Sequence, residues 1–91
     1  MLERTIEQAL IRRVKSLGGL CEKFTSPNKR SVPDRLVTLP GGVIIFVELK
    51  APNKVPTVRQ AYDHKIRREL GCDVRLIDTL DAAKQFPNEN L

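Results

Sequence analysis

The sequence lacks tryptophan and has few aromatic, cysteine or histidine residues. Its 91 residues include three phenylalanines, one tyrosine, one histidine and two cysteines. Cys21 and Cys72 are far apart and form no CxxC or Cys/His pattern, so neither a zinc site nor a disulfide framework is indicated. We expect both thiols to be reduced and partly buried.

Long apolar runs are also absent. The longest run is well below the roughly 20 residues that a membrane span requires. The start, Leu2-Glu3-Arg4, leads into an amphipathic pattern and not into the apolar segment of a signal peptide. These absences predict a protein of the cytoplasm, without a membrane partner.

Acidic residues are outnumbered, with 11 Asp and Glu against 16 Lys and Arg, for a formal net charge of +5. An excess of positive charge is consistent with a polyanionic partner, although charge alone does not decide it. A chain of this length builds one modest core that buries about two-thirds of its unfolded surface. The sequence therefore predicts a single domain over residues 1–91.

The most informative stretch is the apolar run Val43–Val47, which follows a Gly-Gly turn and ends in Glu48-Leu49-Lys50. Its β-prone residues predict a central strand. Side chains alternate along a strand, so Glu48 and Lys50 leave the same face, roughly 6.6 Å apart at about 3.3 Å per residue. A carboxylate and an ammonium group therefore share one patch of the sheet.

A second short strand, Leu36–Leu39, precedes this stretch. The intervening turn folds the two strands into an antiparallel hairpin, which brings Asp34 beside Glu48. Two carboxylates on a rigid sheet suit a hard divalent cation such as magnesium. A neighbouring lysine can stabilise developing charge or deprotonate a metal-bound water, as phosphodiester hydrolysis requires. The alternative is a salt-bridge cluster that only solvates the strand ends.

The chain begins with a predicted helix over residues 2–17, which Gly18-Gly19 ends. Its apolar residues recur at helical spacing and are Leu2, Ile6, Leu10, Val14 and Leu17. Glu7 lies at the edge of that face. It either contributes to the metal site, directly or through water, or is placed with Glu3 for favourable interaction with the amino end of the helix.

Residues 20–25 are predicted to form the first strand, and the polar loop 26–33 follows it directly before Asp34. Lys29 and Arg30 in this loop, together with Lys23 and Arg35, are candidates to hold phosphates near the metal. The alternative is an ordinary solvated basic loop.

Thr57 and Gln60 form a capping box that begins a second long helix, which runs to about Leu70. We expect one face of this helix to be inward, namely Val58, Ala61, Tyr62, Ile66 and Leu70. The more exposed flank is basic and comprises Arg59, Lys65, Arg67 and Arg68. The single histidine, His64, is predicted to be a surface or half-buried helix residue and not a catalytic base.

The last strand is predicted over residues 72–77, and a short helix capped by Asp78 or Thr79 runs from 79 to about 86. The passage from 43 to 77 is long enough for a right-handed parallel crossover. Residues 87–91 are expected to form a loose tail. The fold class is therefore α/β, with a mixed central sheet flanked by helices in the order αβββαβ plus a short C-terminal helix.

Several short motifs of the sequence resemble those of the PD-(D/E)XK nuclease superfamily. More narrowly, the chain is similar to the small stand-alone form of the VRR-Nuc (virus-type replication-repair nuclease) domain, found in phages and bacteria. The resemblance covers roughly residues 2–78. The matching motifs are Ile6–Leu10, Gly18-Gly19, Lys23–Pro27, Val32–Arg35, Phe46–Pro52 and Arg59-Gln60.

The resemblance implies a restriction-endonuclease-like core and an active site for DNA hydrolysis. Asp34, Glu48 and the Leu49 carbonyl would bind Mg²⁺ or Mn²⁺, with Glu7 as the helix-borne acidic residue. Lys50 would activate the water or stabilise the transition state, and Gln60 would orient Lys50 or the water while it caps its helix. The resemblance also places a phosphate contact on Lys23, Ser26 or Arg35. With the basic loop included, the full set of predicted nucleic-acid contacts is Lys23, Ser26, Lys29, Arg30, Arg35 and Lys54.

Stand-alone members resemble homodimeric endonucleases that cut branched DNA, in particular four-way (Holliday) junctions. Two positions depart from the family pattern, since Ser31 and Asn53 stand where glycine is common. Asn53 tolerates the left-handed conformation that glycine would supply. A non-catalytic nucleic-acid-binding protein and a nuclease subunit that needs a partner are the competing interpretations. The complete set Asp34, Glu48 and Lys50 favours an active nuclease.

Overall fold

The computed structural model describes residues 1–29 and 31–88. It contains three helices and four strands in these ranges: α1 (Glu3–Ser16), β1 (Leu20–Lys23), β2 (Arg35–Leu39), β3 (Val43–Leu49), α2 (Val58–Glu69), β4 (Asp73–Ile77) and α3 (Leu80–Gln85). Each predicted element is present, and its ends lie within two residues of those expected.

The four strands form one sheet in the order β1-β2-β3-β4. The first three are a meander of antiparallel neighbours, whereas β3 and β4 run parallel. The connection between β3 and β4 carries α2, as a parallel crossover requires. The mixed sheet with flanking helices confirms the predicted α/β fold class.

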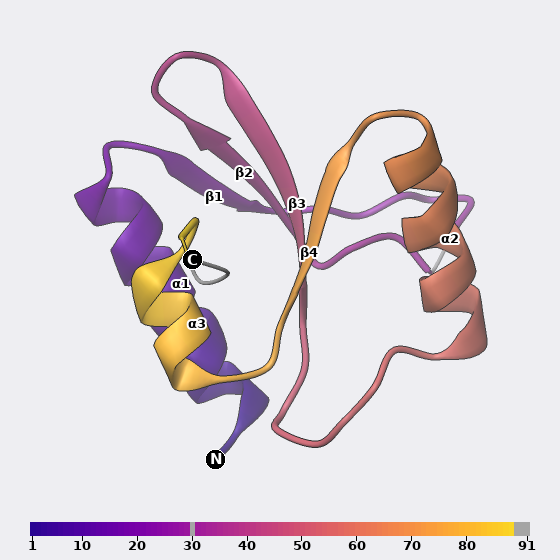
Figure 1. Ribbon diagram of the computed structural model, residues 1–91, viewed down its shortest axis with the longest axis horizontal. Helices are drawn as coiled ribbons and strands as arrows, with labels where there is room; N and C mark the ends of the chain where they lie inside the picture. The colour runs from indigo at the N-terminus through magenta and orange to yellow at the C-terminus, as the bar shows by residue number, and fades with distance from the viewer. Residues whose placement is uncertain (30, 89–91) are drawn as a thin grey trace.

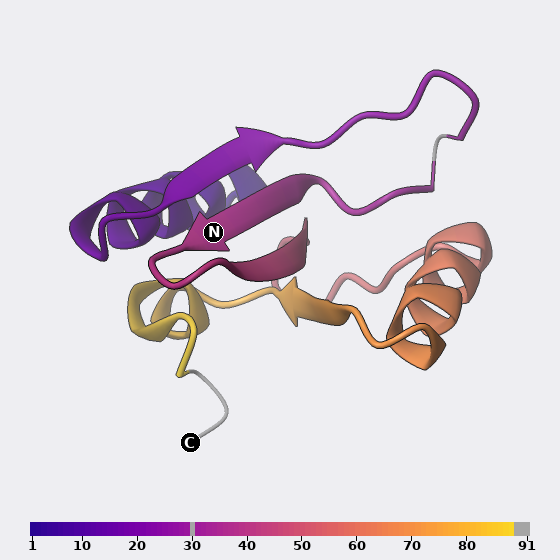
Figure 2. The same ribbon diagram turned by 90° about the horizontal axis from the view of Figure 1, so that it is seen from above.

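The described helices are divided between the two faces of the sheet (Figure 1). Helices α1 and α3 lie side by side on one face, and α2 lies on the other, well separated from them in both views (Figure 2). Alternation along β3 sorts its side chains between these faces. Ile45, Val47 and Leu49 join the core with α1 and α3, while Phe46 and Glu48 face α2.

The hydrophobic core fills the space between the sheet and the α1/α3 pair. Its members come from α1, three strands, α3 and the residue after α3: Ile6, Ala9, Leu10, Val14, Val37, Ile45, Val47, Leu49, Ile77, Ala83 and Phe86. Three of the five residues predicted to form the apolar face of α1 are buried, but Leu2 is 65% exposed because α1 begins only after it. Leu17, just beyond the last turn, is half-buried.

The prediction of which face of α2 is buried is wrong. Val58, Tyr62 and Leu70 are 87%, 64% and 78% exposed, whereas Asp63 and His64 are buried. The prediction assumed that a helix buries its apolar stripe. Here the sheet beneath α2 presents polar and charged groups, so the helix turns its polar side inward and leaves the apolar stripe exposed.

The remaining local predictions concern turns and caps. Asn53 has φ 69°, which confirms that asparagine takes the left-handed conformation expected there. Thr79, and not Asp78, caps α3 by accepting a hydrogen bond from the Ala82 amide. Both cysteines are free and partly buried, as expected. Of the predicted tail, residues 89–91 lie outside the described residues. Within the described ranges, every helix is too short or too polar to cross a bilayer.

Candidate active site

Asp34 and Glu48 lie side by side at the end of the β2–β3 hairpin. The antiparallel register pairs Arg35 with Val47, so the next step along each strand brings Asp34 opposite Glu48. The Leu49 amide donates a hydrogen bond of 2.9 Å to Asp34 Oδ2 and fixes the Asp34 carboxylate at this position. The hairpin therefore places the two carboxylates together, as the sequence predicted.

Glu48 is the most enclosed of the site residues, with 1% of the residue exposed. Its Oε2 accepts a hydrogen bond of 3.1 Å from Gln60 Nε2, and Lys50 Nζ lies 3.5 Å from the same oxygen. Its Oε1 has no hydrogen-bond partner among the described residues. A buried carboxylate oxygen in that state favours a cation at this position.

The charge at this site is not balanced. Burial, and secondly the neighbouring Asp34 carboxylate, raise the pKa of Glu48 to about 7, against the lowering effect of Lys50. Oxygen donors and unpaired negative charge fit a hard divalent ion. In the described part of the chain, no group of three or more His, Cys, Asp or Glu is arranged to hold a metal. The candidate ligands are therefore two carboxylates and a backbone carbonyl.

The Leu49 carbonyl is that backbone candidate. In an extended strand the N–H and C=O of one residue point to the same edge. Since the Leu49 amide points to Asp34, its carbonyl belongs on the same side of β3. Lys50 then follows immediately, where the strand ends and its side chain turns back towards Glu48.

Gln60 connects α2 to the site and caps the helix at the same time. Its Oε1 accepts from the Thr57 amide at 2.9 Å, its own amide donates to Thr57 Oγ1 at 3.2 Å, and its Nε2 donates to Glu48. The expected capping box is thus confirmed. Its side chain contacts Glu48, whereas the resemblance implied that it orients Lys50 or the water.

His64 is a residue that the sequence prediction misplaced. It is 2% exposed, and its Nε2 lies 3.8 Å from Glu48 Oε1. Burial, and then the charge of Arg68, lower the pKa of His64. The spacing of four residues from Gln60 put both side chains on one helix face, and that signal was available in the sequence.

Glu7 reaches the far side of the site from α1. Its Oε2 accepts a hydrogen bond of 3.0 Å from Arg35 Nε, and Arg35 Nη1 donates to the Cys21 carbonyl at 3.2 Å. Glu7 also lines a cavity of about 260 Å³ together with Asp34 and Lys23. The buried position of Arg35 favours orienting Glu7 over contacting a phosphate directly.

The basic loop before Asp34 is tied to α2 by an ion-pair cluster. Asp63, which is 1% exposed, lies 2.7 Å from Lys29 Nζ and 2.7 Å from Arg67 Nε. Burial tends to raise the pKa of Asp63, but the contacts with Arg67 and Lys29 outweigh it and the pKa is lowered. Arg67 also lies over two phenylalanine rings, Phe24 and Phe46, at 5.3 and 5.1 Å.

The other predicted nucleic-acid contacts differ in exposure. Ser26 is half-buried and pairs with Lys29 across the loop, while Lys23 and Lys54 are exposed. Ser26 and Asp34 line a common cavity of about 350 Å³. Arg30 lies outside the described residues. The loop thus carries polar and basic groups up to the edge of the two carboxylates.

Comparison with known proteins identifies the fold and a relative. No family model matches the sequence. A protein described as "Putative nuclease p44", of Acyrthosiphon pisum secondary endosymbiont phage 1, is 46% identical over 88 residues, which cover 97% of this chain and 95% of that protein. A solved structure described as a VRR_NUC domain matches with a TM-score of 0.86 and 32% identity, covering 91% of this chain and 90% of that one.

Proposed function

Since this chain belongs to the VRR-Nuc family of the PD-(D/E)XK nucleases, we propose that it is a Mg²⁺- or Mn²⁺-dependent endonuclease that hydrolyses phosphodiester bonds in branched DNA. The four-way junction is the proposed substrate, and a homodimer is the proposed active form. The single domain over residues 1–91 carries one active site. A two-fold dimer would present two sites, as symmetric cutting of a junction requires.

The observation that carries this proposal is the grouping of Asp34, Glu48 and Lys50 at one end of the sheet. Lys50 Nζ lies 3.5 Å from Glu48 Oε2, and the Leu49 amide between these two residues holds Asp34. The unpartnered Glu48 Oε1 and the raised pKa of Glu48 both favour a bound cation. A purely structural salt bridge would satisfy the carboxylates more fully.

The chain offers a defined set of groups for the ion. Asp34, Glu48 and the Leu49 carbonyl would hold Mg²⁺ or Mn²⁺, and Glu7 would contribute directly or through water across the cavity that it shares with Asp34. When bound, such an ion supplies Lewis acidity, which lowers the pKa of a coordinated water and neutralises charge on the phosphate.

The side chains around the ligands have separate parts in the reaction. The Lys50 ammonium stabilises the negative charge that develops on the phosphate in the transition state, or positions the attacking water. Gln60 fixes one Glu48 oxygen, and the other has no hydrogen-bond partner among the described residues. Because Gln60 also caps α2, the helix cannot shift at this end without moving Glu48.

The groups around the site would hold the DNA backbone. Phosphate contacts fix the register of a nucleic acid and carry no sequence information. We assign this part to the residues near the site and the loop: Lys23, Ser26, Lys29, Arg30 and Lys54. Arg35, which is buried and donates a hydrogen bond to Glu7, would instead orient that carboxylate.

The test is cleavage of a labelled four-way junction and of a linear duplex with Mg²⁺, Mn²⁺ or EDTA. Wild type and Lys50→Ala are compared. The control is Lys65→Gln, which removes one exposed positive charge from α2. We expect metal-dependent cutting of the junction that Lys50→Ala lowers by about 10²- to 10³-fold and Lys65→Gln preserves.

Other results would replace the proposal. Tight junction binding without cutting under any metal would favour the non-catalytic nucleic-acid-binding protein. Neither binding nor cutting would favour a nuclease subunit that needs a partner for substrate choice.

A further inference from the structure

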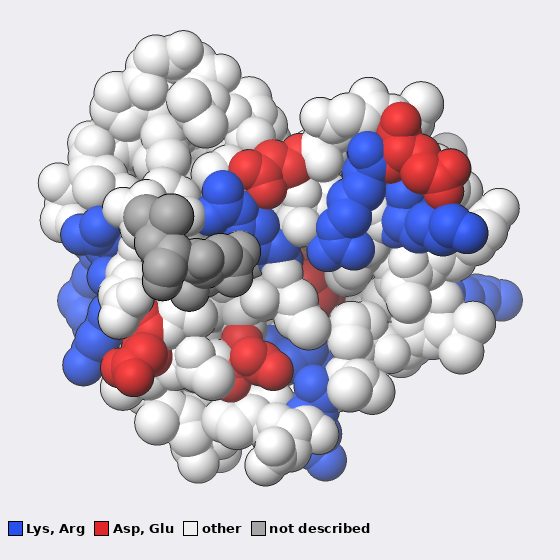
Figure 3. Space-filling model, in the orientation of Figure 1, with Lys and Arg blue, Asp and Glu red and all other residues white. Residues whose placement is uncertain are grey.

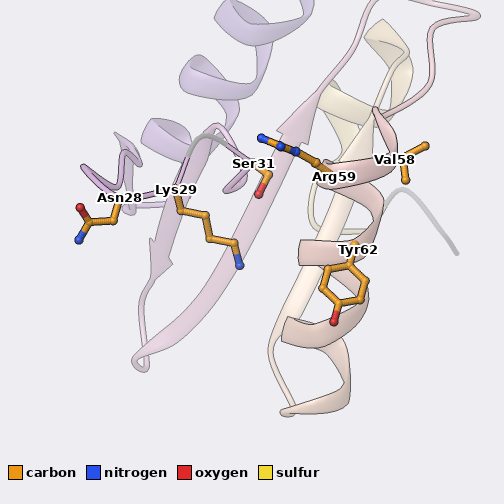
Figure 4. Close-up of a pocket in the computed structure, with 6 residues that line it drawn as sticks. All are labelled: Asn28, Lys29, Ser31, Val58, Arg59 and Tyr62. Atoms are coloured by element: carbon orange, nitrogen blue, oxygen red, sulfur yellow. The ribbon is translucent and has the colours of Figure 1, made fainter.

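A cleft of about 620 Å³ lies between the basic loop and the first turns of α2 (Figure 4). Its walls come from the loop on one side and the first turns of α2 on the other: Asn28, Lys29, Ser31, Val58, Arg59 and Tyr62. None of the three α2 residues was among the predicted site residues. We call this space the α2 cleft.

The α2 cleft combines an exposed aromatic ring with two cations. Tyr62 is 64% exposed, although it was expected to be inward. Figure 4 shows the Lys29 ammonium directed from the loop towards α2, and the Arg59 guanidinium directed across the cleft towards Ser31. Within residues 1–29 and 31–88, no carboxylate forms an ion pair with Arg59, and the Lys29 side chain stays 47% exposed beside Asp63.

The α2 cleft is connected to the proposed active site by the backbone of α2 and by an ion pair from the loop. Arg59 is adjacent in sequence to Gln60, which bonds Glu48 on the inner side of the helix. Consecutive Cα atoms are about 3.8 Å apart, so the cleft and the site both include residues of the first turn of α2. The ion pair between Lys29 and Asp63 also links the loop wall of the cleft to α2.

We propose that the α2 cleft holds one unpaired nucleotide of the DNA substrate, with its base stacked on Tyr62 and its phosphates contacted by Arg59 and Lys29. Proteins bind single-stranded nucleic acid with exposed aromatic rings flanked by basic side chains, because every base offers a π face on which the ring can stack. Bases within a duplex already stack on both sides. An occupant is therefore available only at a branch point, a flap or a single-stranded tail.

A second copy of the chain is the other possible occupant of this surface. A two-fold interface is self-complementary, so the same patch meets itself. Two copies joined through the α2 cleft would bring Arg59 and Lys29 towards their own counterparts, and like charges brought together oppose association. Both basic and acidic side chains are visible over α2 in the space-filling view (Figure 3), so the repulsion comes from Arg59 and Lys29 and not from a uniformly basic face.

This inference rests on the proposed function and adds a substrate feature to it, so the test measures binding separately from cleavage. The anisotropy of two labelled DNAs is titrated in EDTA, one a blunt duplex and the other the same duplex with a single-stranded tail. The variants are Tyr62→Leu, Tyr62→Phe and Arg59→Gln, and Lys65→Gln on the same helix is the matched charge control.

We expect Tyr62→Leu to weaken binding of the tailed duplex about tenfold and to leave the blunt duplex unchanged. Tyr62→Phe retains the ring and should retain affinity. Arg59→Gln should lower the salt dependence of tailed-DNA binding by about 0.7 in the slope of log Kd against log salt concentration, and Lys65→Gln should not. Thermal unfolding of each variant checks that the exposed substitutions leave the fold intact.

Three results would overturn the inference. If wild type prefers the tailed duplex but Tyr62→Leu binds it equally well, the cleft is not the nucleotide site, and the proposed nuclease function stands. If Tyr62→Leu changes the sedimentation coefficient and leaves DNA affinity unchanged, the cleft is an interface between copies. If wild type binds neither DNA with or without Mg²⁺, the proposed function fails together with the inference.

Discussion

The two faces of the sheet are built from different chemistry. On the α1/α3 face, apolar side chains of the two helices and the sheet meet in a single core that includes Phe86 and Ile45. On the α2 face, three polar side chains are buried, Glu48, Asp63 and His64, and Glu48 and Asp63 each form hydrogen bonds or ion pairs. The strand β3 contributes to both faces because side chains alternate along a strand.

The apolar face mainly stabilises the fold, whereas the α2 face carries the ionisable groups of the proposed active site. The α1/α3 face buries apolar area, which stabilises the fold without directional requirements. The α2 face holds ionisable groups away from water, an arrangement that costs free energy unless each charge is paired. Asp63 has two cationic side chains at 2.7 Å, whereas the lysine beside Glu48, Lys50, lies 3.5 Å away. The weaker charge pairing is at the proposed metal ligand.

The largest expected effect on stability comes from the apolar face. Phe86→Ala should lower the free energy of unfolding by about 4 kcal/mol, because it empties a fully buried position against α1. Urea unfolding measures this loss, which should be the same with Mg²⁺ or EDTA. Phe86→Leu is the milder companion if the alanine variant does not fold. A stability loss under 1 kcal/mol for alanine would contradict the assignment of the core.

At the proposed metal ligand Glu48, the expected effect on stability has the opposite sign. The raised pKa of Glu48 means that ionising it opposes folding, so the cost is absent below pH 4.5 and complete above about pH 7. In EDTA at pH 8, Glu48→Gln should therefore be more stable than wild type, by up to about 3 kcal/mol.

This prediction is checked by urea unfolding at pH 5 and pH 8, with DNA cleavage measured in parallel. The two proteins should be nearly equal in stability at pH 5, and the variant should not cut DNA. If Glu48→Gln were less stable than wild type at pH 8, the ionised Glu48 side chain would stabilise the fold instead of opposing it.

The ion-pair cluster is expected to contribute less to stability than the core. Asp63→Asn leaves Arg67 and Lys29 without their carboxylate and should cost about 2 kcal/mol at pH 7, reduced because both partners are partly exposed. The pKa of Asp63 is lowered in the fold. Its contribution is therefore complete above the usual carboxyl pKa of 3.8 and is lost as the pH falls through the lower folded value.

Acid titration of unfolding tests this dependence. Wild type should lose stability below about pH 4, and Asp63→Asn should show a smaller slope there. Equal acid slopes in the two proteins would show that Asp63 is not preferentially ionised in the fold.

The smallest effect is expected on the exposed stripe of α2. Val58→Ser should change the free energy of unfolding by less than about 0.5 kcal/mol, because Val58 is 87% exposed. Thermal unfolding provides the measurement, and Ile45→Val is the buried counterpart, for which a loss of about 1 kcal/mol is expected. An equal loss in both variants would place Val58 in a contact that the isolated chain lacks.

The sequence predicted most of what the apolar face determines. The periodicity of α1, the alternation of β3 and the glycines of the hairpin turn follow local rules that the structure obeys. The neighbouring positions of Asp34 and Glu48 were predictable for the same reason, since they follow from the strand register and the short turn.

The orientation of α2 was not predictable by the same rules. The helix carries an apolar stripe at positions 58, 62, 66 and 70, and periodicity alone turns that stripe inward. The partners Glu48, which is buried, and Phe46, which is half-buried, lie on β3, distant in sequence, and they select the polar side of α2 that holds Gln60, His64 and Arg67. Hydrophobic periodicity does not reveal this choice, and the only sequence signal for it is the spacing of His64 from Gln60.

Titration of Mn²⁺ into the protein by isothermal calorimetry tests most directly whether Asp34 and Glu48 form a metal centre. Wild type should show a saturable site that is lost in both Glu48→Gln and Asp34→Asn. The matched control Asp63→Asn removes another carboxylate from the same face and should retain binding. Equal Mn²⁺ affinity in wild type and Glu48→Gln, or no binding by wild type, would contradict the assignment.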